Sequence, residues 1–213
     1  MKKRLLLFLC IFTLLLSTAA QAEDVTADVP APAPSAEKAD TLSPFARTRS
    51  YDGRFTDVDT SAWYHDAVAA LYEYGLTEGV SGSAYAPEGS VTIAELVTFA
   101  ARLQALERGA AIHTEAAGEA WYQPYVRYLK AEKCLGDELD GHYPEAATRA
   151  QTAGVLAPAL SAECYDERNA EAVTVGYASH RRITDVDDYT PYQNDILRLY
   201  KWGIVGGVNE DGS

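Results

Sequence analysis

Apolar residues recur every three to four positions in several short stretches of the chain. Val68, Leu71 and Tyr72 follow this helical spacing, and Gly75 comes next as a residue that can take the left-handed conformation past a helix end. A longer apolar stripe follows, formed by Leu96, Phe99, Ala100 and Leu103. The pattern therefore predicts two helices joined by a loop, with one apolar face on each.

Two threonines predict where the longer helices begin. Thr92 is followed three residues later by Glu95, and Thr148 is followed at the same spacing by Gln151. In such a capping box each side chain satisfies a free backbone N–H of the other residue. Pro158 should end or kink the second of these helices near the residue before it, because proline lacks a backbone donor.

The same motifs recur in the same order along the chain. The first copy holds residues 55–58, 63–64, 75–76, 87 and 92–95; the second holds 121–122, 135, 143–144 and 148–151; the third holds 183–186, 192 and 203–204. We therefore predict three helix-loop-helix copies over residues 51–109, 110–168 and 169–213, the last truncated. One copy alone cannot bury its apolar stripe, so neighbouring copies are expected to pack together.

The first fifty residues are expected to precede the folded part. Residues 1–22 combine a basic start, an apolar run and a small-residue end, the pattern of a secretory signal peptide. Residues 23–50 are rich in proline and alanine and predict a flexible linker. The apolar run is short for a membrane span, so a secreted chain without a span in its mature part is expected.

The charge of the chain excludes one class of partner. With 31 acidic and 18 basic side chains the formal net charge is −13, and loss of residues 1–22 would make the remainder more acidic. Nucleic-acid binding depends on Lys and Arg that neutralise phosphates, so we set that class aside.

No catalytic or cofactor motif stands out in the sequence. Metal-ligand spacing is lacking among the four histidines, and no phosphate-binding glycine loop or nucleophile motif is found. We therefore expect neither an enzyme, nor a cofactor, nor a metal site. Cys134 and Cys164 could form a disulfide in an exported protein, and the alternative is that Cys134 is a small apolar core residue.

The ordered recurrence of Phe-x-Asp-Val, Trp-Tyr, Gly-Leu or Gly-Ile, a proline-led loop and Thr-Arg-Ala-Gln resembles the S-layer homology domain over residues 55–213. The resemblance implies a mainly α fold in which three copies form a pseudo-threefold unit. It also implies a secreted, non-catalytic module at the cell wall that holds secondary cell-wall polysaccharide, commonly a pyruvylated amino sugar, in grooves between copies.

The resemblance also implies the residues that would bind the sugar. Arg149 is the arginine of the Thr-Arg-Ala-Gln motif, and its guanidinium fork suits a carboxylate. Gln151 and Glu95 belong to the same motif in two copies. A surface salt bridge for Arg149 and a capping role for the other two compete with ligand binding.

Four further residues belong to the candidate site. Trp63 and Trp121 could offer an apolar face to a sugar ring, although packing in the core competes strongly with that role. Asp57 and Asp185 could accept hydrogen bonds from hydroxyls, or could instead accept them from backbone groups in a turn or cap.

Some positions depart from the family pattern. Ile93 stands where the first copy should have arginine, Glu115 where the second should have aspartate, and Pro191 where the third should have tryptophan. We therefore expect at most one or two grooves to bind well. The alternative function is an exported protein-interaction or envelope-scaffolding repeat without glycan binding. The truncated third copy would leave an apolar face uncovered, so self-association or a missing C-terminal portion is also expected.

Overall fold

The computed structural model describes residues 46–114, 118–162, 165–169 and 185–206. These ranges contain five helices: α2 (His65–Glu73), α3 (Ile93–Arg108), α4 (Gln123–Ala131), α5 (Arg149–Ala159) and α6 (Gln193–Lys201). Over the described ranges β-structure is limited to one isolated antiparallel bridge between Thr92 and Ala146. The prediction of a mainly α fold is confirmed. The predicted signal peptide and Glu115 lie outside the described residues.

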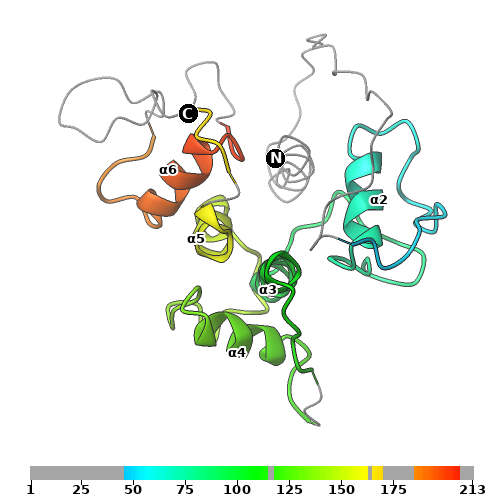
Figure 1. The fold of residues 1–213 in the computed structure, drawn as a ribbon, viewed down its shortest axis with the longest axis horizontal. Helices are drawn as coiled ribbons and strands as arrows, with labels where there is room; N and C mark the ends of the chain where they lie inside the picture. Colours follow the sequence, from blue (N-terminus) through cyan, green and yellow to red (C-terminus); the bar gives the residue numbers. More distant parts are fainter. Residues whose placement is uncertain (1–45, 115–117, 163–164, 170–184, 207–213) are drawn as a thin grey trace.

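The two longer helices, α3 and α5, lie side by side at the centre, and the three shorter helices surround them (Figure 1). Helix α4 packs against α3, and α6 packs against α5. We call these two contacts the α3–α4 seam and the α5–α6 seam. Each seam joins a long helix to the short helix that follows it in the sequence.

The three short helices are built alike. Each has nine residues and begins one position after a tyrosine: Tyr64, Tyr122 or Tyr192. Each is followed by a left-handed residue eleven positions after that tyrosine, with φ of 71° at Gly75, 59° at Lys133 and 70° at Gly203. The next N–H then donates to the carbonyl five residues back, over 2.9, 2.8 and 2.9 Å respectively. This is the hydrogen-bond pattern of a Schellman helix end.

The capping boxes predicted for the two long helices are confirmed. Thr92 accepts from the Glu95 N–H, and Thr148 accepts from the Gln151 N–H, with the reciprocal bond present in both. Helix α3 runs for 16 residues and ends at a left-handed Gly109, whereas α5 has only 11 residues. Pro158 lies in the last turn of α5, so the expected shorter helix is also confirmed.

The beginning of α3 is tied to the loop that precedes α5. The N–H groups of Ile93 and Ala94 donate to the carbonyls of Glu145 and Tyr143, each over 2.8 Å. The Ala147 N–H donates in turn to the Val91 carbonyl, also over 2.8 Å. Two N–H groups that the helix leaves free are thus satisfied by a distant segment, which fixes the two long helices to each other.

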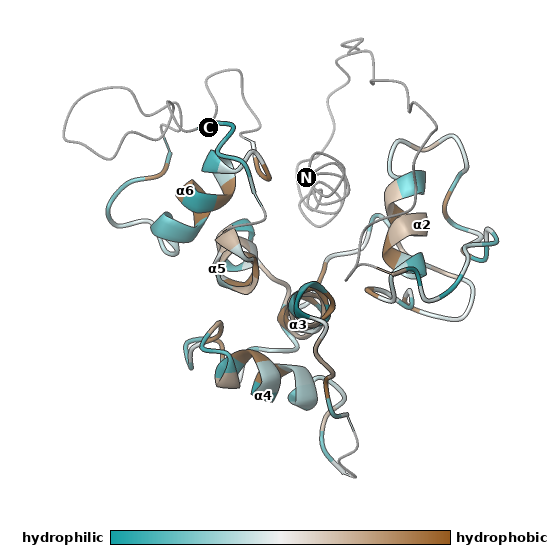
Figure 2. Cartoon of the chain, in the orientation of Figure 1, coloured by the Kyte–Doolittle hydropathy of each residue, from teal (hydrophilic) through white to brown (hydrophobic). Residues whose placement is uncertain are grey.

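Most buried residues of the described ranges form one hydrophobic core centred on α3 and α5. In Figure 2, α5 is mostly apolar, whereas α6 carries both hydrophilic and hydrophobic stretches. Ile93, expected to line a groove in place of an arginine, is instead fully buried in this core. That expectation is wrong because the first residue of α3 faces the core beneath the Tyr143–Glu145 loop.

The structure also bears on two other expectations, the linker over residues 23–50 and the role of Cys134. Arg47 and Thr48, within the predicted linker, bond to Glu73 at the end of α2, so the packed part of the chain begins before residue 50. Cys134 is a free, buried cysteine whose thiol lies 3.1 Å from the Pro158 carbonyl, which fits the core alternative; Cys164 lies outside the described residues. Among the described helices none has the length and apolarity needed to cross a bilayer.

Candidate functional site

The predicted site residues fall into different parts of the structure. Asp57 lies in the loop before α2, where its carboxylate accepts from the backbone N–H groups of Tyr85 and Ala86 at 2.7 to 3.1 Å. Partial desolvation acts against the charged form, but the backbone bonds outweigh it and hold the pKa of Asp57 below its usual value. Asp57 therefore fastens one loop to another. Asp185 is exposed.

The two motif residues Glu95 and Gln151 are helix caps. The Glu95 carboxylate accepts from both the N–H and the hydroxyl of Thr92 at 2.8 Å. The Gln151 side-chain oxygen accepts from the Thr148 N–H at 2.8 Å. One side-chain oxygen of each residue is thus engaged in the capping role that competed with ligand binding.

The two tryptophans are exposed. Trp63 keeps 65% of its surface accessible and Trp121 keeps 59%, so they do not pack in the core, the role that competed with contact to a sugar. Each stands edge-on to the tyrosine that follows it, with ring centroids 5.5 and 5.6 Å apart. Consecutive residues point in different directions, and in both pairs the tyrosine, Tyr64 or Tyr122, packs against the core.

Arg149 lies at the first position of α5 and reaches toward the segment after α6. Its guanidinium donates to the Gly206 carbonyl over 3.3 Å, a long hydrogen bond from an exposed side chain. The arginine therefore spans one end of the α5–α6 seam, between the segments assigned to the second and third copies.

A pocket of about 490 Å³ opens in the α5–α6 seam. Its walls come from the end of α4 and the loop after it, from one face of α5 and from the start of α6. The lining residues that matter for its chemistry are Lys133, Glu138, Gly154, Pro158, Tyr192 and Asp195. Sugar-sized ligands bind in concave sites with a few convergent polar groups, and this pocket offers both.

Two residues at this pocket have strained backbones. Outside glycine, only Ala86, Lys133 and Tyr192 have a positive φ in the described ranges, and the last two, both at 59°, line the pocket. Left-handed backbone costs a residue with a side chain about 1–2 kcal/mol. Residues held in this way concentrate at functional sites, where the surroundings impose the conformation.

The charges at the pocket are mixed. Lys130 is engaged with Asp137 and Asp140 at 2.7 Å, and these carboxylates raise the pKa of its ammonium group. Lys133 is exposed and forms no ion pair with the described residues. Burial raises the pKa of Asp195; the nearby Glu138 charge adds to this rise, and Arg198 opposes it.

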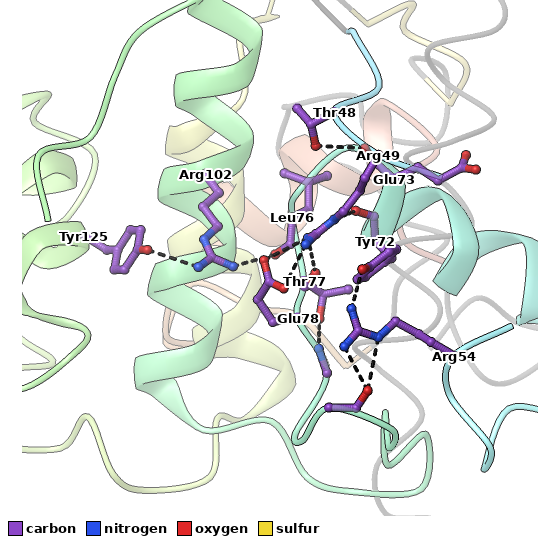
Figure 3. Close-up of polar contacts among 12 residues, drawn as sticks. Thr48, Arg49, Arg54, Tyr72, Glu73, Leu76, Thr77, Glu78, Arg102 and Tyr125 are labelled. Atoms are coloured by element: carbon purple, nitrogen blue, oxygen red, sulfur yellow. Dashed lines mark hydrogen bonds and ion pairs between the residues drawn. The ribbon is translucent and has the colours of Figure 1, made fainter. Parts of the chain in front are cut away.

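A second cluster of charged residues lies beside the end of α2 (Figure 3). Arg49 donates to Glu78 at 2.8 Å, and its guanidinium lies 3.8 Å above the Tyr72 ring. Arg54 bonds to the Tyr72 hydroxyl and to the Gly82 carbonyl. The Arg49 bond lowers the pKa of Glu78, and the charges of Arg102 and Arg54 add to this effect. These contacts fix the N-terminal segment on α2.

Sequence reasoning missed the pocket residues Tyr192 and Asp195. One signal was available: Lys133 stands eleven residues after Tyr122, whereas the matching positions after Tyr64 and Tyr192 hold Gly75 and Gly203. Among the described residues, no cluster of His, Cys, Asp and Glu side chains is arranged to hold a metal ion.

Comparison with known proteins identifies part of the chain. Residues 54–96 match the family model of the S-layer homology domain. A stretch of 44 residues is 48% identical to part of the surface-layer 125 kDa protein of Lysinibacillus sphaericus; it covers 21% of this chain and only 4% of that protein. No solved structure matches the chain.

The matched segment contains α2, the loop with Asp57 and its two backbone partners, and the capped start of α3. Domains of this family are anchoring modules that bind cell-wall polysaccharide, which indicates a location at the cell surface or cell wall. The chain therefore carries an S-layer homology domain at residues 54–96.

Proposed function

We propose that the chain is a secreted, non-catalytic cell-surface anchor with three S-layer homology copies, and that it binds secondary cell-wall polysaccharide between copies. The matched domain at residues 54–96 supports the first copy. Helices α4 and α6 repeat the length, the preceding tyrosine and the left-handed end of α2, which supports a second copy over 110–168 and a third from 169. The pairing of each long helix with the next short helix supports a pseudo-threefold arrangement.

The glycan site is the α5–α6 seam. The observation that carries this proposal is the pocket whose wall includes two residues in left-handed backbone, Lys133 and Tyr192. The Tyr192 ring offers an apolar face to a sugar, and the carboxylates of Glu138 and Asp195 can accept hydrogen bonds from its hydroxyls.

Arg149 supplies the charge for an acidic substituent. A pyruvylated amino sugar carries a ketal carboxylate, and a guanidinium matches this group with two parallel hydrogen bonds. Arg149 is exposed and holds only the Gly206 carbonyl, over 3.3 Å, so most of its donors remain for a ligand. Lys133 at the pocket provides a second cation for the same polymer.

A binding assay on purified sacculi tests this function. The signal-free chain is incubated with sacculi that retain their secondary polysaccharide and with sacculi from which acid has removed it. We expect retention only on the first. Equal retention on both would reject glycan binding and favour the alternative, a scaffolding repeat that uses exposed surfaces such as Trp63 and Trp121.

A further inference from the structure

Equivalent positions line the two seams. In the α3–α4 seam, Arg102 lies ten residues after Thr92, the threonine that caps the long helix. Pro158 lies ten residues after the capping Thr148 and has the same position in the α5–α6 seam. On the short helices, Tyr125 lies three residues after Tyr122 in the α3–α4 seam, and Asp195 lies three residues after Tyr192 in the α5–α6 seam. The segment after the preceding short helix contributes Leu76 and Glu78 to the first seam, and Cys134 and Gly136 to the second.

In the α3–α4 seam the side chain of Arg102 spans the space between the residues at these positions. Arg102 leaves α3 and donates one N–H to the Tyr125 hydroxyl over 3.1 Å and another to the Leu76 carbonyl over 3.4 Å (Figure 3). Its guanidinium lies 5.2 Å from the centre of the Tyr125 ring. The Glu78 carboxylate is close enough for the Arg102 charge to lower its pKa.

In the α5–α6 seam the residues at the equivalent positions leave a pocket open. Pro158 has no long side chain and Gly136 has none, and both line the pocket of about 490 Å³ together with Cys134 and Asp195. Neither Arg102 nor Glu78 therefore has a charged residue at its equivalent position in the α5–α6 seam, where the Glu138 side chain lies beside Gly136.

We propose that Arg102 closes the α3–α4 seam against saccharide, so that each chain holds one glycan, in the α5–α6 seam. This inference rests on the proposed function and specifies which seam performs it. A sugar entering the first seam would have to displace a half-buried guanidinium from the Tyr125 hydroxyl, the Leu76 carbonyl and the Glu78 charge. Separating a charged donor from its hydrogen-bond partners is costly, and an entering sugar would have to replace both of these bonds.

Exchanging the residues at this position tests the inference. Arg102→Ala removes the side chain from the first seam, and alanine is the best helix-forming residue. Pro158→Arg places an arginine at the equivalent position of the second seam and replaces a proline within a helix, so α5 is not expected to weaken. Arg127→Ala is the matched control, because Arg127 is an exposed arginine on α4 paired with Glu119.

The measurement is calorimetric titration of the signal-free chain with polysaccharide released from sacculi and cut to a defined oligosaccharide. We expect one site per chain in the unchanged protein and in R127A. P158R should lower the affinity of that site about tenfold or more. R102A should add a second site, weaker than the first because Ile93 stands where α5 has Arg149.

The possible outcomes are distinct. A single site in R102A at saturating oligosaccharide, or unchanged affinity in P158R with its helical circular dichroism preserved, would overturn the closure by Arg102 while leaving the anchor function intact. No binding by the unchanged protein would overturn the anchor function, and the inference with it. A double variant R102A/P158R that keeps only the weak site would support the inference most strongly.

Discussion

Gly154 on α5 lies directly against the ring of Tyr192 at the start of α6. A Cβ atom added at Gly154 would fall well inside van der Waals contact with three ring carbons of Tyr192. Glycine in the interior of a helix normally costs stability relative to alanine. At Gly154 the aromatic ring at the start of α6 occupies the space that a methyl group would need.

Gly154→Ala is expected to destabilise the protein by about 1–3 kcal/mol, the usual cost of overpacking, despite the better helix propensity of alanine. Urea unfolding followed by circular dichroism measures the change. The partner variant Tyr192→Gly removes the ring, so the double variant should lose less stability than the sum of the two single variants. Additive losses would show that the two residues do not interact.

Lys133→Gly should stabilise the fold and weaken wall binding. The left-handed backbone at Lys133 favours glycine, and relief of this strain is expected to raise the free energy of unfolding by about 1 kcal/mol. The same change removes a cation from the pocket. Thermal unfolding and retention on sacculi are measured on the same preparation. A variant that is more stable but still fully retained would show that Lys133 does not contribute to binding.

Arg149→Ala is expected to lower retention on sacculi while the helical circular dichroism stays unchanged. The side chain is exposed and makes one long bond to Gly206, so its loss costs the fold little. Arg127→Ala serves as the control for a general loss of positive charge. If R149A unfolds at room temperature, Arg149 has a structural role instead.

Glu78 predicts a dependence of stability on pH. The bond from Arg49 holds the folded-state pKa of Glu78 below the unfolded value of about 4.3, so the unfolded chain binds more protons as the pH falls. The contribution of Glu78 is complete above that unfolded pKa and is lost as the pH falls through the folded pKa. Urea unfolding between pH 6 and pH 3 should show a shallower decline in Glu78→Gln than in the unchanged chain. Glu88→Gln, at an exposed loop carboxyl, should leave the decline as it is.

The sequence predicted the elements that depend on local chemistry. Both capping boxes, at Thr92 and Thr148, follow from residues three positions apart, and the short α5 follows from Pro158. The sequence left open whether Trp63 and Trp121 are exposed or buried, because apolar character alone does not say which of two adjacent aromatic residues faces the core. The inward residue is the tyrosine, and only the packing of the helices decides this.

The pocket could not be read from the sequence either. Lys133 follows α4, Gly154 lies within α5 and Tyr192 precedes α6, so these residues come together only when the helices pack. The motif arginine, Arg149, was found because its position within Thr-Arg-Ala-Gln is local. Its partner, the Gly206 carbonyl, is 57 residues away and required the fold.

The most direct test of the account follows backbone amide signals by nuclear magnetic resonance while the signal-free chain is titrated with oligosaccharide from the wall. We expect the amides of Lys133, Gly154 and Tyr192 to shift together, with saturation at one oligosaccharide per chain. Shifts confined to the surroundings of Trp63 and α2, or no shifts at all, would contradict it.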